Sequence, residues 1–222
     1  MSDHTVKAFD EDITRLRGLI GEMGGLAEVA IEEALASLVA GDTERGDRVV
    51  KGDKRIDELE TQVEKFAVRV IALRAPMADD LREVIAALKI AAVVERIGDY
   101  SKNIAKRVGS IENRDRFEPL TLLPAMGDIA GEMVHDALTA YAARDPMLAR
   151  EVIATDNKVD AFYNSIFRNL VTYMVENPAT ISSAAQLLFV ARNLERIGDH
   201  ATNIAEMVHF AATGQYPPEE DR

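Results

Sequence analysis

Apolar and small residues recur at alternating spacings of three and four along most of the chain, which is the period of one face of an α-helix. The clearest series lies between Glu44 and Arg74 and consists of Val49, Gly52, Ile56, Leu59, Val63, Phe66, Val70 and Leu73. Pro, Gly or polar stretches divide the chain into six such segments. We therefore predict an all-α protein with six long helices. The first three are expected over residues 10–40, 44–74 and 77–111. The fourth is expected to end at 144, the fifth to cover 146–176 and the sixth to end at 212.

The second half of the chain repeats the first. A shift of 100 residues places the segment Glu-Arg-Ile-Gly-Asp at 95–99 on the same five residues at 195–199. A shift of 103 places Met-Gly-x-x-Ala at 23–27 on the same pattern at 126–130. The difference of three residues fits a shorter turn between the last two helices. Matches of this length in one frame indicate an internal duplication.

The duplication sets the predicted domain organisation. Residues 1–112 are expected to form a first three-helix repeat and residues 117–213 a second. The fold class is thus two tandem homologous three-helix bundles with up-and-down, spectrin-like helices. The polar stretch at 113–116 is expected to be a linker, and the Pro-rich, acidic residues 214–222 a flexible tail.

Composition narrows the class of function. There is no Cys, which removes disulfides, thiolate metal sites and cysteine nucleophiles. The formal net charge of −12 repels nucleic acids and anionic membranes, so we expect no nucleic-acid partner and membrane contact only through other proteins. The longest apolar stretch, residues 85–94, is interrupted by Lys89 and is far too short to span a bilayer. A cytoplasmic location fits these features.

Carboxylates are paired at a spacing of four residues, which places both members of each pair on one helix face. A single such pair is usually a solvated surface. Here the pairs occur in duplicated register, as Asp53/Asp57, Glu95/Asp99, Asp156/Asp160 and Glu195/Asp199.

The turns between the helices predict that the pairs meet. Asp57 and Glu95 each lie 19 residues from Pro76, and Asp53 and Asp99 each lie 23 residues from it. Residues equidistant from a hairpin turn lie at the same height on adjacent antiparallel helices. The pairs of the second half are likewise symmetric about the break at 177–178. We therefore expect four carboxylates to converge in each half.

The predicted clusters contain no Lys, so the carboxylates need water or a cation. Ligand sets made only of oxygen suit hard ions such as Mg, Ca, Mn or iron. Asn103 and Asn203 continue the same helix stripes and are possible extra ligands, as are Glu32 and His135, which occupy equivalent positions. A helical wheel turns Glu95 away from the apolar seam, which predicts sites on an exposed flank.

Two further pairs of equivalent residues lie beside the carboxylates. Arg96 and Arg196 are expected to form salt bridges to a neighbouring helix. Gly98 and Gly198 are expected to allow close helix packing rather than to take part in chemistry.

These features together resemble the PhoU family, regulators of bacterial phosphate uptake. The resemblance rests on the four Glu/Asp-x-x-x-Asp motifs in duplicated register and on the segments Leu-Arg-Ala-Pro at 73–76 and Ala-Leu-Lys-Ile-Ala at 87–91. It implies a cytoplasmic, non-enzymatic adaptor that associates with the phosphate ABC transporter, through its ATPase, and with the partner sensor histidine kinase. Such a protein restrains phosphate uptake and the phosphate-starvation response. The resemblance also implies a divalent or multinuclear metal at these motifs, with iron favoured and Zn, Mn, Mg or Ca open.

Alternatives remain open from the sequence. Glu132-x-x-His135 and Glu206-x-x-His209 have the spacing of di-iron carboxylate enzymes of the ferritin-like type, provided that both motifs face one core. A metal-free helical adaptor, whose acidic surface binds a basic peptide, is the other alternative. Exposed apolar positions on the third and sixth helices would allow a homodimer, namely Leu81, Val84, Leu88 and Leu188.

Overall fold

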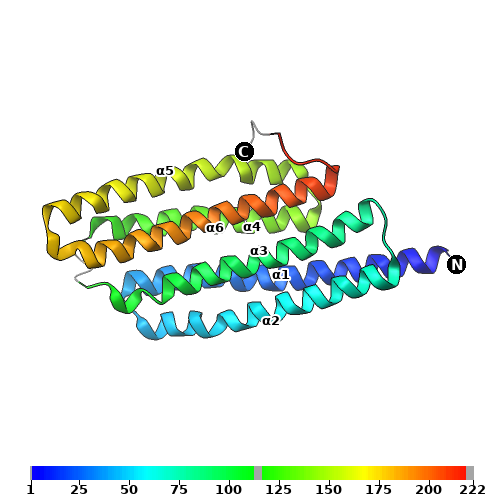
Figure 1. Ribbon diagram of the computed structural model, residues 1–222, viewed down its shortest axis with the longest axis horizontal. Helices are drawn as coiled ribbons and strands as arrows, with labels where there is room; N and C mark the ends of the chain where they lie inside the picture. The colour runs from blue at the N-terminus through cyan, green and yellow to red at the C-terminus, as the bar shows by residue number, and fades with distance from the viewer. Residues whose placement is uncertain (1, 113–116, 219–222) are drawn as a thin grey trace.

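The computed structural model describes residues 2–112 and 117–218. Six long α-helices account for most of this chain, and no β-strand occurs in the described ranges. They are α1 (Ser2–Ala40), α2 (Thr43–Arg74), α3 (Asp79–Ala105), α4 (Leu122–Ala143), α5 (Pro146–Glu176) and α6 (Ile181–Thr213), with short 3₁₀ turns η1 (Val108–Ser110), η3 (Glu118–Thr121) and η4 (Pro178–Thr180). Figure 1 shows α1, α2 and α3 in one bundle and α4, α5 and α6 in a second bundle alongside it. The predicted all-α fold of two three-helix bundles is confirmed.

Local sequence signals determine the starts of α2 and α5. The Asp42 carboxylate accepts a hydrogen bond from the backbone N–H of Arg45, and Asp145 caps the equivalent helix α5 by accepting from Met147 and Leu148. Both aspartates satisfy backbone groups that a helix leaves unpaired at its start.

The third helix ends earlier than predicted, at Ala105 instead of 111. The chain tightens there into η1, and this turn directs Val108 and Ile111 into the core, where both are buried. The linker predicted at 113–116 lies outside the described residues.

The two bundles pack through α1 against α4 and through α3 against α6. The contact between α1 and α4 is reciprocal. A Cβ atom built on Gly24 would lie 2.3 Å from Cδ1 of Leu138, and one built on Gly127 would lie 2.0 Å from Cδ1 of Leu35. Each leucine therefore fills a space that only a glycine leaves. Since these four residues are pairs in the internal repeat, the duplication itself supplies both halves of the interface.

A buried carboxylate adds a second connection between the bundles. Glu83 is 5% exposed, and it binds Arg17 at 2.8 Å and Arg144 at 2.6 Å. Its neighbour Val84 is fully buried, so the expectation that Val84 is exposed is wrong. Of the four positions suggested for a homodimer, Leu81 is the most exposed, at 37%.

The predicted tail begins with packed residues. Gly214 ends α6 with a left-handed φ of 76°, the ring of Tyr216 stacks on Phe210 at 4.8 Å, and Pro217 is buried. Residues 219–222 lie outside the described part of the chain. None of the helices that the structure describes carries an apolar stretch long enough to cross a membrane.

Candidate functional site

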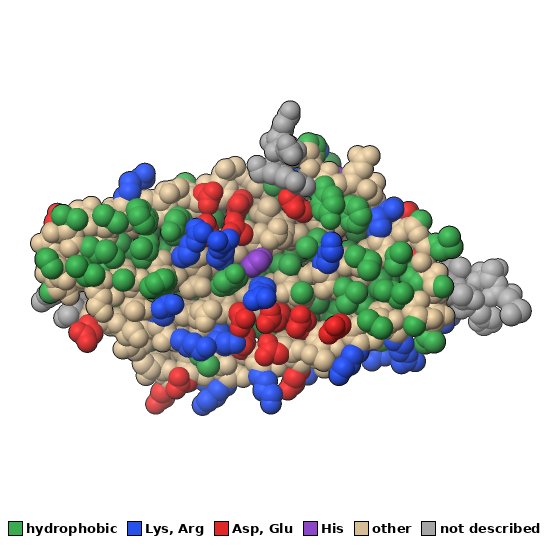
Figure 2. Space-filling view, viewed as in Figure 1, with side chains coloured by type: hydrophobic (Ala, Val, Ile, Leu, Met, Phe, Trp, Pro, Cys, Tyr) green, Lys and Arg blue, Asp and Glu red, His purple; other side chains and the backbone are tan. Residues whose placement is uncertain are grey.

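The structure brings together the four predicted carboxylates of each half. The first cluster comprises Asp53 and Asp57 on α2 with Glu95 and Asp99 on α3, and the second comprises Asp156 and Asp160 on α5 with Glu195 and Asp199 on α6. Figure 2 shows acidic side chains gathered in the middle of the face that these helices form, with Lys and Arg side chains among them.

Glycine allows the carboxylates to approach the neighbouring helix. A Cβ atom on Gly98 would lie 2.9 Å from Cδ1 of Ile56 and 3.2 Å from Oδ1 of Asp53. A Cβ atom on Gly198 would lie 3.1 Å from Oδ1 of Asp156. These contacts are tight for any other residue, and they confirm the prediction that both glycines permit close helix packing.

The first cluster contains a lysine, which corrects the sequence prediction. The ammonium group of Lys102 donates to Oδ2 of Asp53 and, at 2.7 Å, to Oδ1 of Asp99. These two hydrogen bonds hold the pKa of Lys102 well above its usual range. Lys102 lies three residues after Asp99 on α3, so its side chain reaches both Asp99 on its own helix and Asp53 across the bundle.

The remaining acids of the first cluster repel one another. Burial raises the pKa of Asp57, and the charge of Asp53 adds to this effect. Burial also raises the pKa of Glu95, with contributions from Asp99 and Glu60. The cluster is thus a row of mutually repelling carboxylates with one bound ammonium.

The second cluster has a different cation arrangement. Thr202 occupies the position equivalent to Lys102, and its hydroxyl is buried without a hydrogen-bond partner among the described residues. Burial raises the pKa of Asp156 to about 6, and the charges of Asp199 and Asp160 add to this effect. Because no lysine lies between the helices here, no cation in the described structure offsets the negative charge of Asp156.

In the described structure, the arginines that pair with acids of the second cluster lie on α6, as do those acids. Arg192 contacts Glu195 at 2.5 Å, and Arg196 contacts Asp199 at 3.0 Å. All four residues lie on α6. In the first half, Arg96 approaches Glu95 of its own helix at 3.8 Å. The prediction that Arg96 and Arg196 bridge to a neighbouring helix is wrong, because an acid on their own helix lies within reach.

Burial varies across each cluster, although the sequence predicts an exposed flank. Asp53 and Glu195 are buried, with 6% and 9% exposure, whereas Asp57 and Asp160 are exposed. Asp53 and Glu195 also each keep one carboxylate oxygen buried without a hydrogen-bond partner in the described structure. Each cluster therefore extends from solvent into the space between two helices.

The two clusters are linked by an aromatic contact at the centre of the molecule. Tyr100 and His200 occupy equivalent positions, each directly after the last Asp of its cluster. Their rings stack at 5.3 Å across the contact between α3 and α6. Burial lowers the pKa of His200. The amide of Asn203 lies 3.3 Å from Nδ1 of His200, and Asn103 is partly buried at the equivalent place.

The other candidate ligands lie elsewhere. Nδ1 of His135 is 3.3 Å from Glu28 of α1, in a hollow that Glu132 and Asp136 also line. Glu32 is exposed on α1. The structure does not bring His135 to the carboxylates of the second cluster.

The two Glu-x-x-His motifs do not share a core. His135 is bound to Glu28 and is largely exposed, whereas Nδ1 of His209 donates to the carbonyl of Gln215 at the end of α6. The geometry that a di-iron carboxylate enzyme requires is not found in the described chain.

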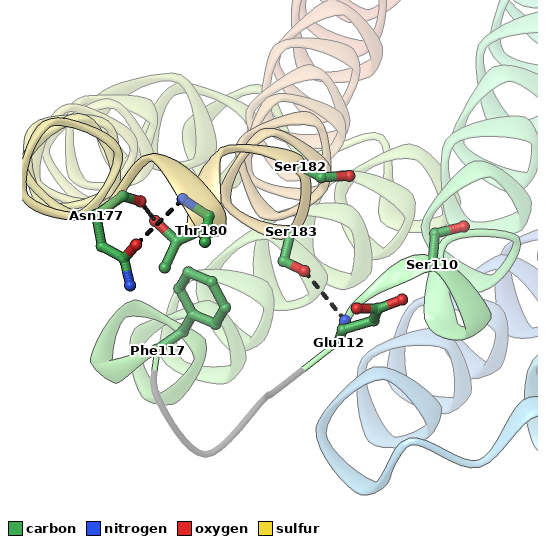
Figure 3. Close-up of a pocket in the computed structure, with 8 residues that line it drawn as sticks. Ser110, Glu112, Phe117, Asn177, Thr180, Ser182 and Ser183 are labelled. Carbon is green, nitrogen blue, oxygen red and sulfur yellow. Dashed lines mark hydrogen bonds between the residues drawn. The ribbon is translucent and has the colours of Figure 1, made fainter.

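A small polar pocket lies where the first bundle meets the start of α6, and the sequence patterns do not predict it. Its volume is about 130 Å³, and Figure 3 shows Ser110, Glu112 and Ser183 on one side of it and Asn177 on the other. The backbone N–H of Glu112 donates to the hydroxyl of Ser183 at 3.1 Å, and the Asn177 side chain accepts from the N–H of Ala179. The first of these contacts joins the end of the first bundle to α6, and the second is local to the turn before α6.

The two clusters differ in whether a cation bridges their carboxylates. As the side chains stand, no group of three or more His, Asp or Glu residues in the described ranges is arranged to hold a metal ion. In the first cluster, Lys102 occupies the place between Asp53 and Asp99. In the second cluster, the charges of Asp199 and Asp160 act on Asp156, and Asp156 forms no ion pair among the described residues. Carboxylate oxygens are the ligand type that hard ions prefer.

Comparisons with known proteins agree with this architecture. The family model described as "PhoU domain" matches residues 20–108 and again 123–208. A protein of Zymomonas mobilis named phosphate-specific transport system accessory protein PhoU homolog is 55% identical over 219 residues, which cover 99% of this chain and 92% of that protein. A protein of the same name from Caulobacter vibrioides is 45% identical over 97% of this chain and 94% of its own length.

Solved structures show the same fold. The crystal structure of PhoU from Pseudomonas aeruginosa superposes with a TM-score of 0.87 at 35% identity, covering 93% of this chain and 100% of that one. The phosphate transport system regulatory protein PhoU from Streptococcus pneumoniae superposes with a TM-score of 0.88 at 26% identity, covering 95% and 99%. With the family model matching both halves and relatives aligned over nearly the whole length, this chain belongs to the PhoU family.

Proposed function

We propose that this protein is an accessory and regulatory protein of phosphate transport that restrains phosphate uptake and the phosphate-starvation response. The observation that carries the proposal is the match of the PhoU domain to both halves, together with relatives named as phosphate-specific transport system accessory proteins along nearly the full length. In this proposal the protein acts in the cytoplasm, without catalysis, between the ATPase of the phosphate ABC transporter and the sensor histidine kinase.

The charge of the molecule supports an adaptor that binds proteins. A net charge of −12 favours basic protein surfaces over nucleic acid or anionic lipid. The two bundles are held in one arrangement by the reciprocal glycine–leucine contacts and by Glu83, so the protein presents a defined surface to both partners.

A deletion strain tests the regulatory proposal. Without the protein, alkaline phosphatase is expected to be expressed constitutively at high phosphate, and a plasmid carrying the wild-type chain is expected to restore repression. Normal repression in the deletion strain would count decisively against negative regulation. A double deletion that also lacks the kinase separates the pathway from unrelated effects, because constitutive expression should then disappear.

We further propose that the carboxylate clusters are the place where the protein binds a hard metal ion, with iron favoured and Zn, Mn, Mg or Ca open. The support is chemical: carboxylate oxygens converge from two helices, and burial, with the charges of neighbouring acids added to it, raises the pKa of Asp156 and Glu195. Bound metal would supply positive charge at this surface. The residues proposed to hold it are Asp53, Asp57, Glu95, Asp99, Asp156, Asp160, Glu195 and Asp199.

Metal analysis tests this second proposal. Protein purified without chelator is expected to contain metal, and a variant with the four acids of the second cluster changed to Asn or Gln is expected to contain less. If neither protein holds metal and both restore repression in the deletion strain, the metal-free adaptor is the better description.

A further inference from the structure

We infer that the two carboxylate clusters are not equivalent toward cations: Lys102 is the resident cation of the first cluster, so the residues of the first cluster do not fit a metal ion, and metal binding is left to the second cluster. This inference rests on the proposed metal binding and restricts it to one half of the molecule. It goes against the symmetry of the sequence motifs, which are the same in both halves.

The position of Lys102 carries the inference for the first cluster. Its ammonium group bonds to Asp53 of α2 and to Asp99 of α3, so it occupies the place between the helices that a bridging ion would need. The side chain of Lys102 is 23% exposed and that of Asp53 is 6% exposed. A metal ion would have to break both charge-assisted hydrogen bonds and leave the ammonium beside it, which opposes binding.

The second cluster lacks this bridge. Thr202 replaces Lys102 and contributes a neutral hydroxyl, which is buried without a hydrogen-bond partner among the described residues. The carboxylate of Glu195 is buried: its Oε1 accepts from Arg192 of the same helix, and its Oε2 has no hydrogen bond, as is also true of Oδ1 of Asp53 in the first cluster. No ion pair joins α5 to α6 at this level within the described chain.

The clusters differ in where their basic side chains lie and not in how many basic side chains are nearby. The second cluster has two arginines nearby, Arg192 and Arg196, but their side chains are 44% and 46% exposed and contact acids of α6 only. The guanidinium of Arg192 also lies 5.6 Å from the centre of the Tyr163 ring on α5, but in the described structure neither arginine forms an ion pair with an acid of α5. In the first cluster the single lysine lies within that space. A divalent ion therefore finds converging oxygens in the second half and an ammonium group in the first.

Exchange of one residue between the halves tests the inference. Mn²⁺ binding to chelator-treated full-length protein is measured by electron paramagnetic resonance and by isothermal titration calorimetry. Lys102→Thr gives the first cluster the residue of the second, and we expect an about twofold increase in bound Mn²⁺ because both clusters then offer the same four carboxylates. Thr202→Lys gives the second cluster the resident cation of the first, and we expect binding to fall to background.

Controls make the result specific. Lys106→Thr removes an exposed lysine one turn beyond Lys102 and is expected to bind as the wild type does. Lys102→Arg keeps a cation in place and is expected to show no gain. Circular dichroism checks that each variant is folded, and if Lys102→Thr does not fold, Thr202→Lys decides the question alone.

Each outcome has a distinct meaning. Unchanged binding in folded Lys102→Thr, or wild-type binding in Thr202→Lys, overturns the inference and leaves metal binding by the protein intact. Absence of Mn²⁺ from the wild type and from every variant overturns both the inference and the proposed metal binding. Gain in the first exchange with loss in the second supports the inference.

Discussion

The two halves of this protein share a fold and a motif but differ in how they balance charge. In the first half a lysine side chain joins α2 to α3 by bonding to Asp53 and Asp99. In the second half the equivalent residue is a threonine, and the pKa of Asp156 is raised to about 6. Duplication has preserved the placement of the carboxylates on the helices, whereas the residue three positions after the last Asp differs and decides whether a cation joins the two helices.

The halves also differ beside the clusters. Glu60 and Glu64 extend the acidic row of the first half, and Tyr163 and Phe167 take their places in the second. The rings of Tyr163 and Phe167 lie 6.3 Å apart, and the guanidinium of Arg192 lies 5.6 Å from the centre of the Tyr163 ring. The second half thus places a cation over an aromatic ring, whereas the first half has two further acids at the equivalent positions.

The largest effect is expected at Glu83, the buried carboxylate whose equivalent in the second half is Ser183. Glu83→Gln leaves Arg17 and Arg144 without a charged partner, so unfolding should become easier by about 3 kcal/mol. The matched change Ser183→Ala, at the equivalent position, removes one acceptor for the N–H of Glu112 and should cost about 1 kcal/mol. Urea denaturation followed by circular dichroism measures both values. Equal losses would show that Glu83 has no special role in joining the bundles.

The next effect concerns the first cluster. Asp53→Asn removes one of the two carboxylates bound to Lys102 and should destabilise the protein by about 2 kcal/mol at neutral pH, because a largely buried ammonium loses a partner. Lys102→Met tests the other member of the pair, and a double-mutant cycle isolates their interaction. An interaction energy near zero in this cycle would contradict the assignment of Lys102 as a resident cation.

The corresponding change in the second cluster should have the opposite sign. The pKa of Asp156 in the folded protein, about 6, is above that of an aspartate in an unfolded chain, about 3.9. The carboxylate therefore costs least below pH ~4, and its destabilising effect grows as the pH rises from about 4 to about 6 and is constant above that.

Asp156→Asn is accordingly expected to stabilise the chelator-treated protein at pH 8 by about 1 kcal/mol, after allowance for solvent screening, and to have little effect at pH 4. Denaturation curves across this pH range provide the measurement, with Asp160→Asn, at an exposed position on the same helix, as the control. Destabilisation of Asp156→Asn at pH 8 would remove the contrast between the clusters.

The smallest effect is expected at the exposed contact between His135 of α4 and Glu28 of α1. His135→Ala removes an exposed contact with Glu28, and its cost should stay below about 0.5 kcal/mol. Since His135 does not reach the second cluster, Mn²⁺ binding should be unchanged as well. A clear loss of Mn²⁺ would return His135 to the set of ligands.

Much of the fold follows from local sequence. The Asp caps of α2 and α5, Pro76 and Pro146 mark helix ends through short-range hydrogen bonds and backbone geometry, so these ends were predictable. The end of α3 was not predictable in this way. The turn η1 follows α3, and Val108 and Ile111 are buried in the core, which depends on residues distant in the chain. The presence of Lys102 in the first cluster had an available signal, the spacing of three residues from Asp99, which typically allows an ion pair on a helix.

The sequence by itself determined six helices, their duplication, the PhoU family and the convergence of four carboxylates in each half. These properties depend on helical period and on distance from a turn, and both can be counted along a chain. Only the tertiary structure decided that Lys102 reaches across to Asp53, that Tyr100 meets His200, and that Leu35 and Leu138 enter the spaces at Gly127 and Gly24. Those contacts depend on how far each helix is rotated about its axis and how closely the bundles approach, which packing of the whole chain sets.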